Sequence, residues 1–250
     1  GPASVLFGQV EPGGIINTIT KKPLSEPYYK FALEVGNYGF YQPSIDFSGP
    51  LDDDKNILYR FIASYQSSNN IQPFFEPQVT TIAPSITFNL GDNTKLDLYY
   101  EYIRYFANDI KTDAVVLSDG SLTPRDFYVG YPNLNFFDIT TQRFGYSLDH
   151  KFNDNWQIRN NLAVISTVTT DERGYGIGLV DDRFIQIESL DYDYSRDNYF
   201  GQIDLLGKFT TGSISHQLLM GFDFNRLVNP LTMIQNLDIP DQEILNPNND

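Results

Sequence analysis

Aromatic side chains and two arginines gather in the stretches of this sequence that lie between its regular parts. Residues of these types are suited to binding, because aromatic faces stack on organic groups and guanidinium groups pair with carboxylate or catecholate oxygens. Any single aromatic residue could instead pack these stretches against each other or mark a membrane interface. Together they predict a concave site for a bulky organic ligand. The candidate binding residues are Phe74, Phe75, Phe106, Arg125, Phe127, Tyr128, Tyr131, Phe136, Phe137, Arg173 and Tyr175.

Groups suited to catalysis are sparse. His150 and His216 both stand beside short polar stretches, with no serine or acidic residue obviously placed to act with either. The run 52–54 is three aspartates, which lacks the alternate-ligand spacing of a calcium loop. There is no cysteine, phosphate-binding loop, dinucleotide fingerprint or nucleophile elbow. We therefore expect no enzyme and no metal or cofactor bound directly by the protein.

Composition narrows the class of protein. The 250 residues carry 17 Lys plus Arg against 32 Asp plus Glu, and the formal net charge of −15 argues against nucleic acid as a partner. No apolar run approaches the roughly 18 residues that a membrane helix needs. Aromatic residues make up 15% of the chain, which excludes disorder and, with many Gly, Asn and Asp residues, favours an all-β protein.

The elements that must position these residues follow a period of two. Apolar and polar residues alternate from Tyr28 onward, as in strands that have one apolar face. The pattern repeats nine times, which predicts strands over 30–36, 43–48, 58–66, 81–90, 96–103, 143–149, 156–164, 199–205 and 217–225.

The links between these strands alternate in length. Short polar turns are predicted at 52–56, 91–94, 153–155 and 210–213. Longer links are predicted at 68–79, 107–138, 174–188 and from 229 onward, with one short exception at 37–39. Long links alternating with short ones around a meander are typical of an outer-membrane β-barrel. Aromatic residues near strand ends, such as Trp156, Phe209 and Tyr102, fit the interface belts of such barrels.

A soluble β-sandwich is the alternative, since its strands also alternate. It is disfavoured here because its inward residues would be less aromatic and its loops more even in length. Bacterial barrels usually have an even number of strands, so nine strands predict an open sheet with further strands after Asp250. We interpret the chain as a piece of a longer protein.

The polar side of the predicted strands carries both charges. One interpretation is that this wall hydrogen-bonds material inside the barrel and lines a path through it. The other is that these are ordinary wetted interior residues, paired with one another. The residues are Arg60, Asp97, Glu101, Arg143, Arg159, Gln202 and Asp223.

The first 23 residues differ from the rest. Residues 1–8 read GPASVLFG and residues 12–23 read PGGIINTITKKP, with a proline-containing linker at 24–27. This opening resembles the end of the plug domain in TonB-dependent siderophore receptors. The residues that carry the likeness are Gly1, Pro2, Gly8, Pro12, Gly13, Gly14 and Asn17.

The likeness extends into the strands. Residues 49–51 are similar to that family's first periplasmic turn, and 122–127 with 130–133 resemble a segment of one of its extracellular loops, apart from Tyr131 where an acidic residue is expected. Residues 144–152 and 215–223 are similar to later strands of the family. The resemblance thus covers essentially the whole chain.

The resemblance implies a fold and a function. It implies a transmembrane antiparallel β-barrel, about nine strands of a probable total of 22, with residues 1–23 ending the plug, 24–27 as linker and 28–250 as part of the barrel. It also implies an outer-membrane receptor that binds a ferric siderophore as substrate and imports it with energy from TonB and its inner-membrane complex. A general diffusion porin is the alternative from the passive class. The plug-like opening and the long link at 107–138 argue against it.

Overall fold

The computed structural model describes residues 20–69, 74–108, 115–124, 127–236 and 239–244. These residues form one antiparallel sheet and a short 3₁₀ turn, η1 (Pro132–Leu134). Strand bounds are β1 (Tyr28–Val35), β2 (Tyr41–Pro50), β3 (Ile57–Ser67), β4 (Gln78–Leu90), β5 (Thr94–Asn108), β6 (Asn135–Asn153), β7 (Trp156–Val180), β8 (Phe184–Thr211), β9 (Ile214–Val228), β10 (Leu231–Asn236) and β11 (Gln242–Glu243).

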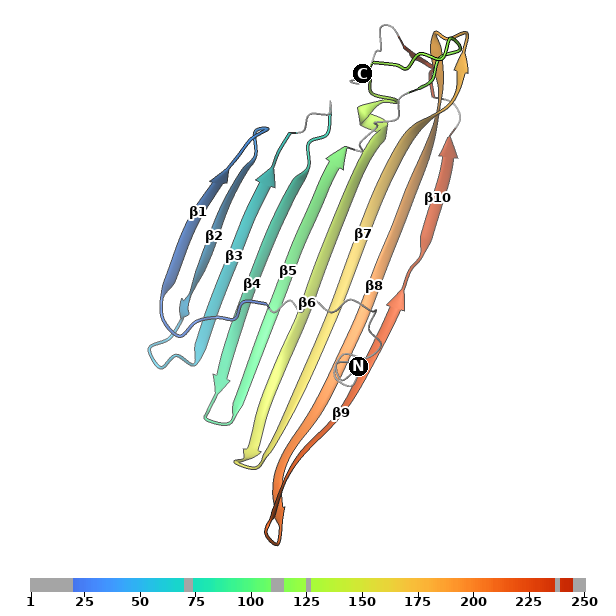
Figure 1. Cartoon of the computed structure of the whole chain (residues 1–250). Helices are drawn as coiled ribbons and strands as arrows, with labels where there is room; N and C mark the ends of the chain where they lie inside the picture. The colour runs from blue at the N-terminus through green and yellow to red at the C-terminus, as the bar shows by residue number, and fades with distance from the viewer. Residues whose placement is uncertain (1–19, 70–73, 109–114, 125–126, 237–238, 245–250) are drawn as a thin grey trace.

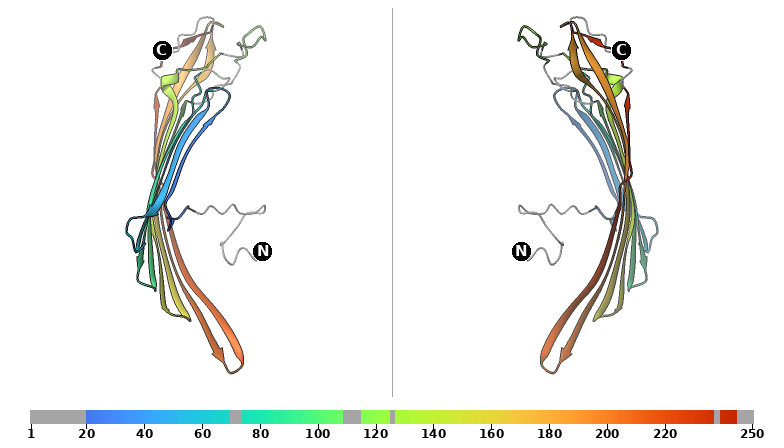
Figure 2. Two further views of the ribbon diagram at one scale, coloured as in Figure 1. Left: turned by 90° about the vertical axis from the view of Figure 1, so that its left-hand side faces the viewer. Right: turned by 90° about the vertical axis from the view of Figure 1, so that its right-hand side faces the viewer.

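Each strand from β1 to β8 pairs with the next one along the chain, which gives a meander. Strands β9, β10 and β11 all pair with β8, so they share the ninth position across the sheet. The sheet is bowed along its strands and is not closed (Figure 2). The described part of the chain contains no apolar helix of a length that would cross a bilayer.

The pairing register confirms the two predicted faces. Phe31 lies opposite Ile45, Phe47 opposite Phe61, and Phe61 opposite Pro84, so that apolar residues meet across neighbouring strands. The same holds further along, where Ile203 lies opposite Phe222. Because directly opposed residues of an antiparallel pair share a face, the sheet has an apolar outer face and a polar inner face.

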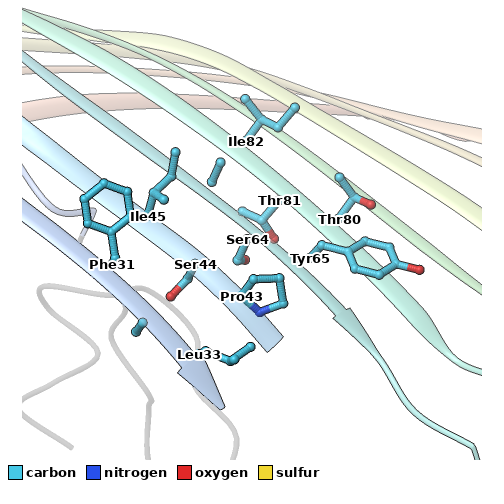
Figure 3. A pocket seen from close by; sticks show the side chains of 12 residues that line it. Phe31, Leu33, Pro43, Ser44, Ile45, Ser64, Tyr65, Thr80, Thr81 and Ile82 are labelled. Carbon is cyan, nitrogen blue, oxygen red and sulfur yellow. The ribbon is translucent and has the colours of Figure 1, made fainter. Parts of the chain in front are cut away.

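The outer face is uncovered. Phe31 is 76% exposed and Phe222 69% exposed, and no second layer of the described residues lies over them. A sandwich would have buried both rings, so this alternative is wrong. A shallow groove of about 630 Å³ runs over β1 to β4 on this face, between Phe31, Leu33, Ile45 and Ile82 (Figure 3).

Aromatic residues mark the lower edge of the outer face, beside the short turns. Trp156 lies across Gly207 on the neighbouring strand, where a Cβ atom would come within 2.5 Å of the indole. Phe209 stacks on His216, and His150 lies edge-on to Phe152, with ring centroids 4.9 Å apart in both pairs. Both histidines therefore sit in the interfacial positions that short turns provide.

Two features differ from the sequence prediction. The link expected at 174–188 is the end of a long β7–β8 hairpin that turns at 181–183. The link expected after 229 contains β10 and β11, which share the ninth position of the sheet with β9. Strand β7 has 25 residues, which at about 3.3 Å per residue is far longer than the roughly ten residues that cross a bilayer. Its upper part therefore extends beyond the apolar band, where Glu172 and Asp138 occupy the outer face.

Candidate functional site

Strand alternation places the predicted polar wall on the inner face. Two of its members pair with each other, since Arg143 Nη1 lies 3.6 Å from Glu101 Oε2. Arg159 instead pairs with a further residue of this face, because its Nε donates to Asp149 Oδ1 over 2.9 Å. Gln202 donates to Asp204 over 3.0 Å and lies opposite Asp223 in the register. These contacts match the interpretation of a wetted, internally paired wall.

Arg60 and Asp46 form the best-shielded ion pair of the inner face. Arg60 Nε donates to Asp46 Oδ1 over 2.8 Å and Nη2 to Oδ2 over 2.7 Å, and both side chains are buried. Lys21, which precedes the first strand, adds a third contact, because its Nζ lies 3.0 Å from Asp46 Oδ2. The two-pronged geometry makes Arg60 a directional partner rather than a point charge.

The segment before β1 is held against this wall at three more points. Lys22 Nζ lies 3.0 Å from Asp97 Oδ2, and Arg60 Nη1 donates to the Lys22 carbonyl over 2.8 Å. The Leu24 amide donates to Ser48 Oγ over 2.8 Å. A cavity of about 320 Å³, lined mainly by apolar atoms, remains between residues 20–23 and strands β3 to β6. Arg60 and Asp97, both predicted inner-wall residues, thus bind the N-terminal segment.

An aromatic and cationic platform lies higher on the inner face, where β6, β7 and β8 run side by side. The Arg173 guanidinium stands over the Phe137 ring at 5.0 Å and over the Tyr192 ring at 5.8 Å. Arg173 also pairs with Asp171, with Nη2 2.6 Å from Oδ2. The structure therefore brings together two predicted binding residues, Phe137 and Arg173.

Sequence reasoning missed Tyr192 and Asp171. The alternation of Asp191, Tyr192, Asp193 and Tyr194 is a period-two signal that could have extended the predicted eighth strand toward the N-terminus and placed Tyr192 on the inner face. Above the platform, Tyr175 lies opposite Glu188, and burial followed by the contribution of Glu188 raises the pKa of Tyr175.

Phe127 and Tyr128 lie inside a small core of loop residues. Phe127 is 9% exposed and Tyr128 3% exposed. Phe127 packs with Val129 and with Ile185 and Ile187 of the β7–β8 hairpin, and Ile244 completes the cluster. Phe127 thus packs against the β7–β8 hairpin and Tyr128 against Phe74, and contact of either ring with a ligand stays a prediction.

The buried side chain of Gln242 hydrogen-bonds to the backbone of the loop core. Its Oε1 accepts from the Gly130 amide over 2.9 Å, and its Nε2 donates to the Tyr128 carbonyl over 2.9 Å. Tyr131 also faces this segment, since its hydroxyl donates to the Pro240 carbonyl over 3.1 Å. Burial, with a contribution from the negative charge of Asp241, raises the pKa of Tyr131. The link residues 115–124, 127–134 and 239–244 therefore form one unit with the hairpin (Figure 1).

The remaining candidates are scattered. The Phe106 and Phe136 rings, 5.8 Å apart, lie on the outer face of β5 and β6. Phe74 is partly exposed and contacts Tyr128 edge to face, with centroids 5.2 Å apart, while Phe75 is half-buried. Arg125 and the plug-like residues Gly1, Pro2, Gly8, Pro12, Gly13, Gly14 and Asn17 lie outside the described residues.

Groups for metal binding or catalysis do not converge in the described part of the chain. It holds no cluster of three His, Cys, Asp or Glu residues that could bind a metal ion. His150 Nδ1 and His216 Nε2 instead bond to the hydroxyls of Thr94 and Thr211 at 2.8 and 2.6 Å. The Asp52 carboxylate accepts the amides of Asn56 and Ile57, so it closes a turn.

The chain is similar in sequence to known outer-membrane receptors and transporters for iron chelates. No family model matches the chain. The chain is 31% identical to the ferrichrome outer membrane transporter/phage receptor of Escherichia coli (strain K12), covering all of this chain and 37% of that protein. It is 27% identical to the ferrioxamine B receptor of Salmonella typhimurium (strain SL1344), covering 93% of this chain and 34% of that protein.

A solved structure shares the fold. The closed form of the ferric-catecholate import receptor Fiu from E. coli K12 superposes with a TM-score of 0.78 at 19% identity, over 98% of this chain and 38% of that one. The chain spans about a third of the length of the curated relatives it matches.

Proposed function

We propose that the chain is part of a TonB-dependent siderophore receptor, and that the whole protein imports a ferric siderophore across the outer membrane of a Gram-negative bacterium. The chelate is the substrate and arrives with its iron already coordinated, so the protein needs to recognise only the organic rim. This fits a site of aromatic faces and hydrogen-bonding groups without metal ligands.

The observation that carries this proposal is the attachment of residues 21–24 to the inner wall. Lys21 and Lys22 reach the carboxylates of Asp46 and Asp97, on strands β2 and β5. A segment held across the polar face supports a barrel that is filled by preceding residues. We assign residues 1–23 to the end of a plug, 24–27 to a linker and 28–250 to part of the barrel.

A general porin is the weaker alternative. An open diffusion channel has no use for a segment fixed across its wall, and the relatives reported above are receptors and transporters for iron chelates. The same names favour transport over catalysis. A plugged barrel needs an energy source to open, so we assign TonB and its inner-membrane complex as partners, with outer-membrane lipid around the apolar face.

We place the chelate site at the aromatic and cationic platform around Arg173. Phe137 and Tyr192 offer ring faces to the organic rim, and Arg173 offers hydrogen-bond donors to chelate oxygens while it stays near Asp171. Tyr175 lies on the same inner face, one step nearer the loops. Phe127 and Tyr128 support this site indirectly by keeping the loops folded over the hairpin.

The test is uptake of purified iron-55 chelates by an iron-limited deletion strain that carries the full-length gene. Selective uptake that stops when TonB is deleted supports the proposal. Uptake that continues without TonB and does not discriminate between chelates and sugars of similar size would indicate a porin instead.

A further inference from the structure

Two aromatic and carboxylate pairs follow each other up the inner face of the β7–β8 hairpin. In the lower pair, Asp171 is balanced by Arg173, which also stands over the Tyr192 ring. In the upper pair, Tyr175 lies opposite Glu188, and burial, with a contribution from the negative charge of Glu188, raises the pKa of the Tyr175 hydroxyl. No ion pair to Glu188 occurs among the residues that the structure describes. The upper pair therefore also places a tyrosine beside a carboxylate, but it has no counterpart of the Arg173 guanidinium.

Glu188 is buried and incompletely paired. The residue is only 7% exposed to solvent. Its Oε1 atom has no hydrogen-bond partner among the described residues. Leaving a buried carboxylate oxygen unpaired is costly, and native proteins seldom do so without a bound group to supply the missing donor. A donor that also carries positive charge would balance the carboxylate as Arg173 balances Asp171.

A carboxylate beside aromatic rings suits a cationic nitrogen. Ring faces attract ammonium and guanidinium groups, as the stacking of Arg173 over Phe137 and Tyr192 already demonstrates within this hairpin. We propose that the imported chelate carries a cationic nitrogen on its organic rim, and that this group binds Glu188 Oε1 beside Tyr175. This inference rests on the proposed function, because it places the chelate in that site.

The experiment uses the full-length protein and two pairs of synthetic ferric chelates. One pair is a linear trihydroxamate that ends in a primary ammonium and the same molecule N-acetylated; the other is a triscatecholate with the same two end groups. In at least one pair, we expect the ammonium chelate to bind about tenfold more tightly than its N-acetylated counterpart, because a charge-assisted hydrogen bond contributes about this much to affinity. Glu188→Gln is expected to abolish this preference and leave the affinity of the acetylated form within about twofold, which also shows that the site remains folded.

Glu172→Gln is the matched control. It removes the same charge from the neighbouring strand β7, but Glu172 lies on the outer face, opposite Asp191 and three positions from Tyr175. The control is expected to keep the preference for the ammonium form. Equal binding of both end groups by the unaltered protein, or a preference that persists in Glu188→Gln, would overturn the inference. If cells that carry the unaltered protein take up none of the chelates, the proposed function itself is contradicted.

Discussion

Lys22 Nζ lies 3.0 Å from Asp97 Oδ2, so a lysine ahead of the first strand is held by a carboxylate 75 residues further along the chain. Asp97 is buried and also accepts the Thr87 hydroxyl at 2.5 Å. The pair joins the segment preceding the sheet to its middle. It makes the inner wall a binding surface for that segment, not only a lining.

Lys22→Gln is expected to loosen residues 20–24 while the strands stay intact. The Lys22 side chain is about half exposed, so the expected loss is about 1 kcal/mol, near the upper end for such ion pairs. Hydrogen exchange at the Leu24 amide, which bonds to Ser48, should rise about fivefold, the rate change for that energy. Lys151→Gln, at an exposed position beside a short turn, should leave this exchange rate unchanged, and a rise in both variants would contradict the prediction.

Arg60→Ala is expected to destabilise the strands themselves. It leaves the Asp46 carboxylate buried with only Lys21 as a charged partner, which should cost about 3 kcal/mol in the free energy of unfolding. Arg60→Lys keeps the charge but loses the two-pronged geometry, and should cost less than half of this. The urea midpoint of the full-length protein in lipid vesicles measures both. Equal losses for Ala and Lys would mean that geometry rather than charge decides.

Gln242→Ala is expected to release the loop unit. The substitution leaves the buried Gly130 amide without its acceptor and the Tyr128 carbonyl without its donor, at a local cost of about 2 kcal/mol. Amide exchange should accelerate in 127–131 and remain unchanged in β2–β5. Gln186→Ala, an exposed position on the same hairpin, serves as the control. Unaltered exchange in 127–131 would show that Gln242 does not fasten the loops.

Phe127→Ala is expected to act on the same unit through packing. The ring is buried among Val129, Ile185 and Ile187, and its removal should cost about 3–4 kcal/mol of local stability. Chelate affinity should fall only as far as the loops unfold, so Phe127→Leu should restore both together. If Phe127→Leu keeps the loops protected from exchange and still loses affinity, the ring contacts the ligand directly.

The turn at Asp52 is expected to loosen in acid. Its carboxylate accepts the Ile57 amide over 2.7 Å and the Asn56 amide over 3.1 Å, and these bonds hold the pKa of Asp52 below its ordinary value. The stabilisation is thus present above the ordinary pKa of about 3.9 and is lost as the pH falls through the lower folded pKa. Exchange at the Ile57 amide should rise in that window. Asp52→Asn should abolish this pH dependence, and its persistence in the variant would assign it to another group.

The meander and its two faces could be predicted from the sequence because a strand has a fixed period of two. Once the short turns are placed, the parity of each apolar residue determines its face, and the register follows from pairing apolar with apolar. Phe61 opposite Pro84 and Ile203 opposite Phe222 are consequences of that rule. The types of residue at the candidate site, aromatic residues together with arginine, could also be predicted from the sequence.

Which of those residues meet was decided by tertiary structure. The glycines at 174, 176 and 178 indicate a loop locally, yet the hairpin continues through them because loop residues Phe127 and Val129 pack on Ile185 and Ile187. That extension carries Arg173 to Phe137 and Tyr192 and leaves Glu188 buried beside Tyr175. Contacts between residues so far apart in the chain depend on which strands extend and which loops fold back, and no local pattern encodes this. Local sequence therefore determined which face each strand residue takes, and the packing of the loops determined which residues form the site.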